Sequence, residues 1–166
     1  MKVFISRTRR VVCEAMINLP ISAGAAWGQL RDVRASGTHD PFHSSIRIEG
    51  NVPRAGAKLE IEHQYILWRT TRIGRILRWN ERTGFAFSDL CRSDPQRAFP
   101  HIFTLELQPI DSASCRLRIR VGGRWTAPLP KWIGRIWLWW VFSQLVRNTT
   151  NYLLRFAIAV RTTSGR

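Results

Sequence analysis

Histidines and carboxylates at short spacing are the side chains in this 166-residue sequence that could carry chemistry. His39, Asp40 and His43 form an HDxxH cluster, which offers two imidazoles and a carboxylate of the kind that metal sites use. Pro41 interrupts any helix that would bring both imidazoles to one side, and no further ligand lies nearby in the sequence. We therefore expect no metal and no cofactor, and a role for this segment in loop packing or at the mouth of a cavity.

A second candidate is His63, which could act as a general acid or base together with Asp89 or Glu62. Alternation along a strand points Glu62 to the opposite face, and the sequence alone does not place Asp89. No GxSxG nucleophile elbow occurs, and the three cysteines lack CxxC spacing, which favours reduced thiols over disulfides or zinc. No complete catalytic motif is present. The catalytic candidates are therefore limited to His63, Asp89, His39 and His43.

These side chains must be positioned by a sheet and a long helix. Alternating apolar residues predict strands at 11–17, 45–52, 57–68, 71–80, 83–91, 101–107 and 115–125. A short helix follows the N-cap residue Ser22, and a proline-free segment from Lys131 to about Val160 predicts one helix of some eight turns. Consecutive strands with short turns form an antiparallel meander, and one face of such a sheet must be covered. The expected fold is α+β, with a curved sheet of about seven strands gripping the long C-terminal helix.

This order of elements resembles the helix-grip superfamily, also called START-like or SRPBCC. The resemblance also rests on Leu19-Pro20, the WGQLRD segment at 27–32, the turn glycine Gly56 and the LQP strand ending at 107–109. The superfamily includes START lipid-transfer domains, polyketide cyclases and dehydrases, and plant pathogenesis-related allergens. The resemblance implies one domain over residues 11–160, after an N-terminal extension at 1–10 and before a flexible tail at 161–166. It also implies a deep apolar cavity, but it carries over no catalytic signature.

Strand alternation and the helical wheel predict which side chains would face such a cavity. His63 and Tyr65 would bring polar tips among apolar neighbours, where they either satisfy one another or orient a ligand. The same set could equally be an ordinary core without a ligand. The predicted cavity residues are Trp27, Leu59, Ile61, His63, Tyr65, Phe85, Phe87, His101, Phe103, Leu105, Leu138, Phe142 and Leu145.

Charge and aromatic residues suggest a second surface. The chain carries 26 basic and 11 acidic residues, a net charge of +15, and 23 of the basic residues are arginine. The start of the long helix is apolar nearly all round, which predicts a cavity portal or a patch for a membrane or another partner. Alternatively, Trp125, Trp132 or the loop at 36–43 covers this patch, or it forms a homodimer seam. The patch consists of Ile133, Ile136, Trp137 and Trp140 beside Lys131 and Arg135.

Two functions remain open from the sequence. The first is binding or transport of a hydrophobic small molecule or lipid, with an anionic membrane surface as a further partner. The second is an enzyme similar to polyketide cyclases and dehydrases that uses a pocket histidine. Nucleic acid ranks third because no recognised binding motif accompanies the charge. The N-terminus lacks a secretory signal, and the charge-free run at 136–146 is too short to span a bilayer. We therefore expect a cytoplasmic protein that can attach peripherally to a membrane, in an oligomeric state that the sequence does not predict.

Overall fold

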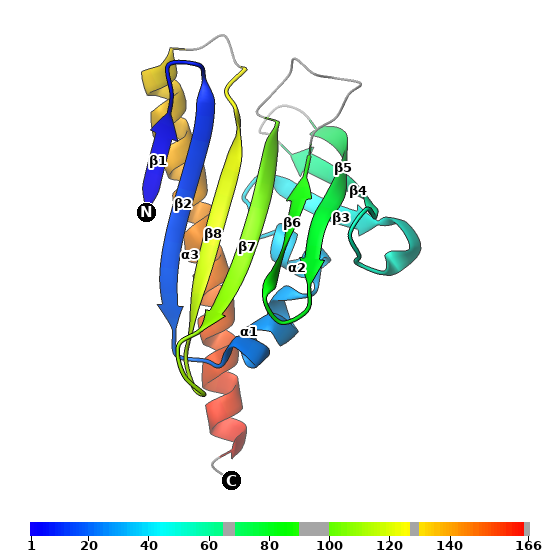
Figure 1. The fold of residues 1–166 in the computed structure, drawn as a ribbon, viewed down its shortest axis with the longest axis vertical. Coiled ribbons are helices and arrows are strands. Elements are labelled where there is room, and N and C mark those ends of the chain that lie inside the picture. The colour runs from blue at the N-terminus through cyan, green and yellow to red at the C-terminus, as the bar shows by residue number, and fades with distance from the viewer. Residues whose placement is uncertain (65–68, 90–99, 127–129, 165–166) are drawn as a thin grey trace.

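An eight-stranded antiparallel sheet and one long helix form the framework of the protein (Figure 1). The computed structural model describes residues 1–64, 69–89, 100–126 and 130–164. The spatial order of the strands is β1-β2-β8-β7-β6-β5-β4-β3. The strands are β1 (Lys2–Ile5), β2 (Arg10–Leu19), β3 (His43–Ile48), β4 (Lys58–Gln64), β5 (Arg69–Asn80), β6 (Gly84–Ser88), β7 (His101–Pro109) and β8 (Cys115–Arg124). The helices are α1 (Ala23–Leu30), α2 (Val33–Gly37) and α3 (Lys131–Ser164), with a short 3₁₀ turn at Glu49–Asn51. This arrangement confirms the predicted α+β helix-grip class.

Both ends of the chain contribute more regular structure than the sequence indicated. Strand β1 comes from residues 1–10, the segment expected to precede the domain, and it pairs with β2 so that Val3 lies opposite Cys13. Val3 and Ile5 pack against the core, so this segment completes one edge of the sheet. Helix α3 continues to Ser164, into the segment expected to be a flexible tail. Because β1 joins the sheet, the sheet has eight strands instead of about seven.

Helix α3 covers one face of the sheet and supplies much of the core on that side. In Figure 1 it lies behind the sheet and runs along β2 and β8, while β3 and β4 turn away from that direction as the sheet curves. Its buried side is apolar, as the wheel predicted, whereas Arg147, Asn148 and Arg155 are exposed. The buried apolar side chains of α3 are Leu138, Val141, Phe142, Leu145, Leu153 and Ala157.

A carboxylate fixes helix α1 to the turn between β5 and β6. The Ser22 hydroxyl caps α1 by accepting from the backbone N–H of Ala25 at 3.2 Å. The buried Trp27 then donates its indole N–H to Glu81 at 2.9 Å, and Trp79 donates to the other oxygen of the same carboxylate at 2.9 Å. The two indoles lie 5.1 Å apart. Trp27 therefore anchors α1, which two internal glycines would otherwise weaken.

Gly134 allows the start of α3 to approach the end of the sheet closely. A Cβ atom at this position would lie 2.7 Å from the ring of the buried Trp125, which is too close for any real contact. Trp125 follows β8, and its backbone N–H donates to the carbonyl of Arg9 at 2.9 Å. The backbone of Trp125 is therefore fixed to the β1–β2 turn, while its indole packs against the start of α3. A larger residue at 134 would push α3 away from the sheet at this end, where the candidate site lies.

Candidate ligand pocket

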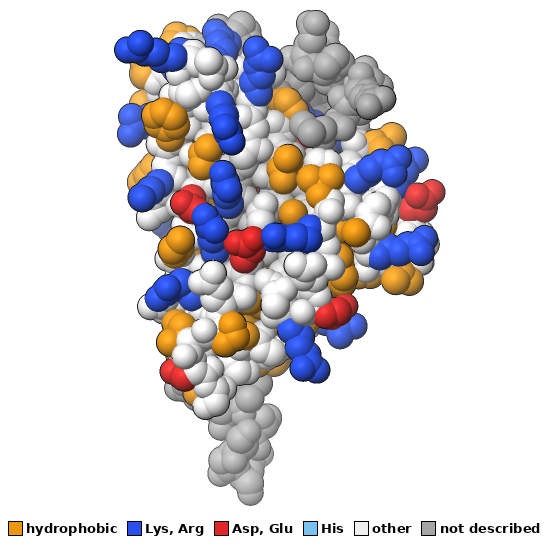
Figure 2. Space-filling model, viewed as in Figure 1, with side chains coloured by type: hydrophobic (Ala, Val, Ile, Leu, Met, Phe, Trp, Pro, Cys, Tyr) orange, Lys and Arg blue, Asp and Glu red, His pale blue; other side chains and the backbone are white. Residues whose placement is uncertain are grey.

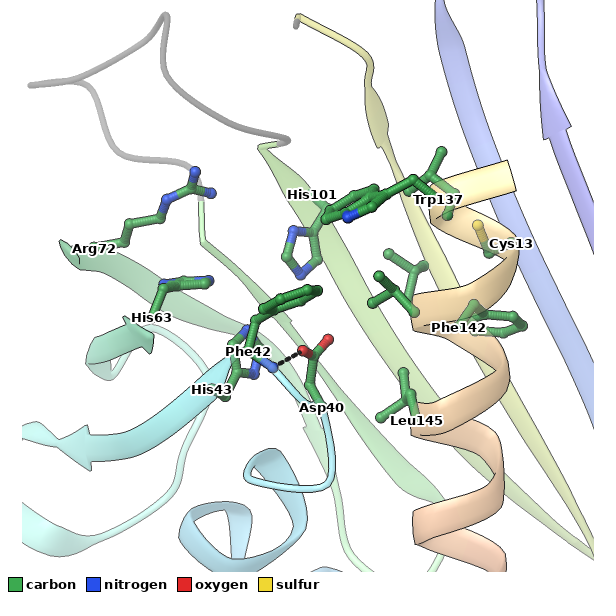
Figure 3. Close-up of a pocket in the computed structure, with 13 residues that line it drawn as sticks. Cys13, Asp40, Phe42, His43, His63, Arg72, His101, Trp137, Phe142 and Leu145 are labelled. Atoms are coloured by element: carbon green, nitrogen blue, oxygen red, sulfur yellow. Dashed lines mark hydrogen bonds between the residues drawn. The ribbon is translucent and has the colours of Figure 1, made fainter. Parts of the chain in front are cut away.

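A small pocket lies between α3 and the inner face of the sheet (Figure 3). Its volume is about 50 Å³, which is room for a few water molecules. Histidines and Arg72 come from the sheet side, and apolar side chains come from α3. The lining residues are Cys13, Asp40, Phe42, His43, His63, Arg72, His101, Val121, Trp137, Leu138, Val141, Phe142 and Leu145.

Three buried histidines form the polar side of the pocket. His43 lies opposite His63 in the β3–β4 pairing, and their rings meet edge to face at 4.6 Å. His101, at the start of β7, stacks on His43 at 6.2 Å. Nδ1 of His43 contacts the carbonyl of Gly37 at 3.1 Å. Because a carbonyl can only accept, this nitrogen carries the proton, and the ring orientation is fixed from the α2 side.

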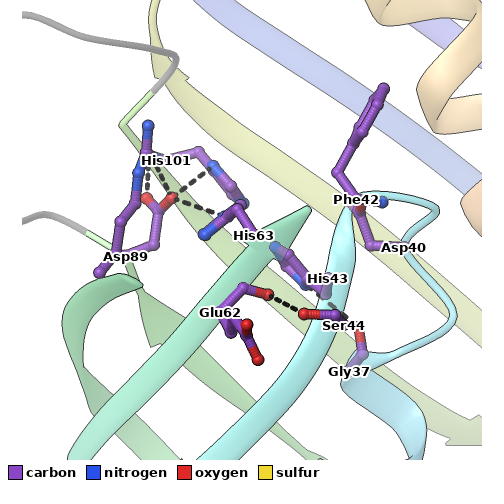
Figure 4. Close-up of polar contacts among 10 residues, drawn as sticks. Gly37, Asp40, Phe42, His43, Ser44, Glu62, His63, Asp89 and His101 are labelled. Carbon is purple, nitrogen blue, oxygen red and sulfur yellow. Dashed lines mark hydrogen bonds and ion pairs between the residues drawn. The ribbon is translucent and has the colours of Figure 1, made fainter. Parts of the chain in front are cut away.

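Asp89 holds the polar side together (Figure 4). It directly follows β6, and its side chain is 0% exposed. One carboxylate oxygen lies 2.5 Å from Nη1 of Arg72, 3.3 Å from Nδ1 of His101 and 3.6 Å from Nε2 of His63. The other oxygen accepts the backbone N–H of His101 at 2.7 Å. One carboxylate thus links β4, β5, β6 and β7 at the edge of the pocket.

Burial and these contacts set the charges of the cluster. Burial is the main reason that the pKa of His63 falls to about 3, and His43, Arg72 and His101 lower it further against the opposing effect of Asp89. Burial alone would raise the pKa of Asp89, but His101, Arg72 and the backbone N–H outweigh it and the pKa is lowered. At neutral pH the cluster therefore contains an ionised Asp89 and a neutral His63, which can accept a hydrogen bond.

Cys13 reaches the pocket from β2 as a neutral thiol. It is buried, and burial raises its pKa to about 12. Because the thiolate is the reactive form, Cys13 is a packing residue at neutral pH and no nucleophile.

Phe42 separates the pocket from the outer surface of α3. It belongs to the loop between α2 and β3, and its ring stacks on Trp137 at 5.6 Å and also contacts Trp140 at 6.2 Å. In Figure 3 the Phe42 side chain projects from this loop between the histidines and α3. Trp137 is held on its other side by Trp125, at 5.9 Å. These four rings therefore form one contiguous aromatic cluster on this side of the pocket.

The predicted cavity residues divide between this pocket and the core. His63, His101, Leu138, Phe142 and Leu145 line the pocket. Tyr65 lies outside the described residues. The remaining side chains are buried in the core and do not line the pocket, so much of the space expected between sheet and helix is filled. They are Trp27, Leu59, Ile61, Phe85, Phe87, Phe103 and Leu105.

The catalytic candidates also separate. His63, Asp89 and His43 lie together at the pocket, whereas His39 packs against Tyr152 of α3 with ring centroids 4.8 Å apart. Asp40 turns its carboxylate back to the N–H of Phe42 at 2.8 Å, which shapes the loop. The HDxxH cluster is thus dispersed. Within the described residues, no group of three or more histidine, cysteine or acidic side chains has the arrangement of a metal site.

Several of the lining residues lie outside the set that the sequence predicts for the cavity. Arg72 is not among the residues predicted to line the cavity. It shares one side of β5 with Gly74 and Ile76, which is a weak indication that its side chain points inward. Phe42 lies in a loop, where no periodicity exists. The other additions are Cys13, Asp40, Val121, Val141 and Trp137, the last of which was assigned to the surface patch.

The exposed apolar residues at the start of α3 coincide only in part with the predicted patch. Ile136 and Trp140 are exposed, whereas Ile133 and Trp137 are half-buried. Within the described residues, no helix has both the length and the apolar character that a bilayer crossing requires.

Comparison with solved structures shows the fold of the protein. The aromatase/cyclase Zhui from Streptomyces sp. R1128 is 13% identical with a TM-score of 0.67, and the match covers 93% of this chain and 96% of that one. A START superfamily protein from Mycobacterium smegmatis is 12% identical with a TM-score of 0.67, covering 87% and 97%. Ara h 8.0201 is 14% identical with a TM-score of 0.61, covering 88% and 99%. No protein-family model and no curated protein sequence matches the chain. The protein therefore has the START-like helix-grip fold that its sequence resembles.

Proposed function

We propose that the protein binds a small, largely apolar molecule that carries one polar group. The observation that supports this most directly is that a buried histidine cluster and an apolar helix face line the same pocket. The polar group would contact His43, His63 and His101, and the apolar part would lie along α3. Such pockets combine an apolar wall with a few fixed polar groups. The likeness in fold to an aromatase/cyclase and a START superfamily protein supports a hydrophobic ligand.

The small volume implies that the pocket opens when a ligand enters. A space of about 50 Å³ holds a few water molecules but no lipid or ring system. The polar side is fixed by the Asp89 contacts, and the α3 side belongs to the core. Phe42 is half-buried and belongs to a loop, so its displacement from Trp137 would enlarge the pocket without moving the sheet or α3.

The expected result is that two substitutions change ligand binding in opposite directions. Val141→Phe would fill the pocket and weaken binding of the neutral fluorescent dye N-phenyl-1-naphthylamine by about tenfold or more. A tenfold loss of affinity corresponds to only about 1.4 kcal/mol of binding free energy. Phe42→Ala would remove the ring that limits the volume and strengthen binding of the same dye by several-fold. Fluorescence titration measures both effects.

Each variant has a matched control in this chain. Val146→Phe places the same ring on a partly exposed position of α3 outside the pocket, and Phe4→Ala removes an exposed ring from β1. Both controls should bind the dye like the unmodified protein. Equal dye affinity in Val141→Phe, Phe42→Ala and both controls would show that the pocket is not the binding site.

Acid–base catalysis is a second candidate function. It is favoured by the geometry of His63 and the ionised Asp89, 3.6 Å apart at the pocket, and it requires that a bound ligand raise the pKa of His63 from about 3. If the bound molecule is converted, His63→Gln should reduce its turnover by about 100-fold or more, the range for loss of a general base. Dye affinity should change far less, because the apolar wall is intact. Mass spectrometry of the ligand extracted before and after incubation measures turnover, and unchanged turnover in His63→Gln would eliminate this role.

A further inference from the structure

Large apolar side chains are exposed on one side of the first turns of α3. Trp132 is 66% exposed, Ile136 61%, Trp139 55% and Trp140 48%. Their spacing of four, seven and eight residues places them on one side of a helix, and we call this set the exposed aromatic face. A tryptophan buries about 150–250 Å² when it is covered, so three half-exposed indoles approach the few hundred Å² that mark an interaction site.

Basic side chains surround this face. Lys131 and Arg135 are exposed on α3 itself, and Arg124 is exposed at the end of β8. Nζ of Lys131 donates to the carbonyl of Arg7 at 2.9 Å, which brings the exposed Arg7 and the β1–β2 turn beside the start of the helix. Figure 2 shows several basic side chains at the upper end of the sheet face, where the acidic side chains in view lie further down.

The charge at this end has no acidic counterpart on its own elements. The sequence contains no Asp or Glu before Glu14 and none after Asp111, so neither α3 nor the β1–β2 turn carries one. The N-terminal end of a helix already has a partial positive charge, and basic residues in its first turns add to it. An anionic partner would offset this accumulated charge.

We propose that this end of the protein docks on the surface of an anionic phospholipid bilayer. The exposed aromatic face enters the interfacial region, where indoles are favoured, and Lys131, Arg135, Arg124 and Arg7 contact the headgroups. A symmetric dimer through the same face would bring the basic residues of two copies together without acidic partners. A nucleic acid would use the charge but would leave Ile136 in water. The docking does not require a ligand in the pocket.

Sedimentation with phospholipid vesicles tests the proposal. The protein should bind vesicles that contain phosphatidylserine and bind pure phosphatidylcholine much more weakly, and added salt should reduce the difference. The double variant Trp132→Ser/Trp139→Ser should lower vesicle affinity by about tenfold or more because it removes two indoles from the interface. Its control is Ile73→Ser/Leu77→Ser, which removes two comparably exposed apolar side chains from β5.

Charge reversal provides a second comparison on the same helix. Arg135→Glu should lower affinity for the anionic vesicles by on the order of tenfold, whereas Arg155→Glu, exposed near the other end of α3, should have little effect. The pocket variant Val141→Phe should still bind vesicles, so a failure of the proposed ligand function leaves this test intact. Equal binding to both vesicle types, or equal binding by all variants, would overturn the proposal. The proposal would also be overturned if the protein does not bind vesicles but forms a dimer in solution, and Trp132→Ser/Trp139→Ser dissociates that dimer.

Discussion

Asp89→Asn is expected to lower the free energy of unfolding by about 3–5 kcal/mol, the range measured when one partner of a buried ion pair is removed. Asparagine keeps the shape of the side chain and can still accept the backbone N–H of His101. It removes the negative charge that lies 2.5 Å from the buried Arg72. Urea denaturation at neutral pH measures the loss.

The ion pair between Arg118 and Glu14 is the matched control. Its N–O distance is also 2.5 Å, but its side chains are 34% and 23% exposed instead of 9% and 0% for Arg72 and Asp89. Solvent screening should limit the effect of Glu14→Gln to about 1 kcal/mol or less. Replacing both buried charges with apolar residues, as in Arg72→Met/Asp89→Leu, should restore part of the stability. Equal losses for Asp89→Asn and Glu14→Gln would contradict the role assigned to burial.

The stability of the protein is expected to fall as the pH is lowered from about 6.5 toward 4.5. The pKa of His63 is about 3 in the folded protein and about 6.5 in the unfolded chain, so between these values only the unfolded chain binds the proton. The stability contribution is complete above the unfolded pKa and decreases by up to about 1.4 kcal/mol per pH unit as the pH falls. Over two units this amounts to about 2–3 kcal/mol.

His63→Gln should flatten this dependence because glutamine does not titrate. Asp89 contributes little in the same window, since its lowered pKa leaves it ionised in both states above pH 4.5. Burial also lowers the pKa of His39, which adds in the same direction. His39 is only partly buried, however, so His39→Gln is the matched control and should remove a smaller share. Parallel curves of unfolding free energy against pH for His63→Gln and the unmodified protein would contradict the assignment.

The order of elements could be predicted because each long element carries its own periodicity. The absence of proline from α3 and the alternation of Leu59, Ile61 and His63 along β4 were both visible in the sequence. Strand β1 was not, because four residues contain too few alternations to separate a strand from a disordered end. Its pairing with β2 is a tertiary contact that the local sequence does not specify.

The polar side of the pocket was harder to predict because a bulge changes which way side chains face in β3, and exposed apolar residues hide the inward parity of β5. A bulge between His43 and Ser45 allows His43 and Ile46, three positions apart, to point inward together. In β5 the exposed Ile73 and Leu77 have the opposite parity to the buried Ile76, so the pattern conceals the inward position of Arg72. Pairing register, which only the tertiary structure supplies, resolves both cases.

The sequence also does not determine the rotation of α3 about its axis. A wheel places Ile133, Ile136, Trp137 and Trp140 on one side, but it does not say which edge of that side meets the sheet. Contacts of Trp137 with Trp125 and Phe42 decide this, and they turn Trp137 into the pocket wall. Trp132 and Trp139 are thereby left exposed.

Phe42 touches a tryptophan on each of two surfaces, Trp137 in the pocket wall and Trp140 on the outside of α3. A single ring is therefore shared between the proposed ligand site and the proposed membrane-docking site. If a ligand displaces this ring, it also changes the packing of Trp140, so occupancy of the pocket alters the affinity for the bilayer. Thermodynamic reciprocity requires the bilayer to alter ligand affinity by the same factor, which would couple loading and release to arrival at a membrane.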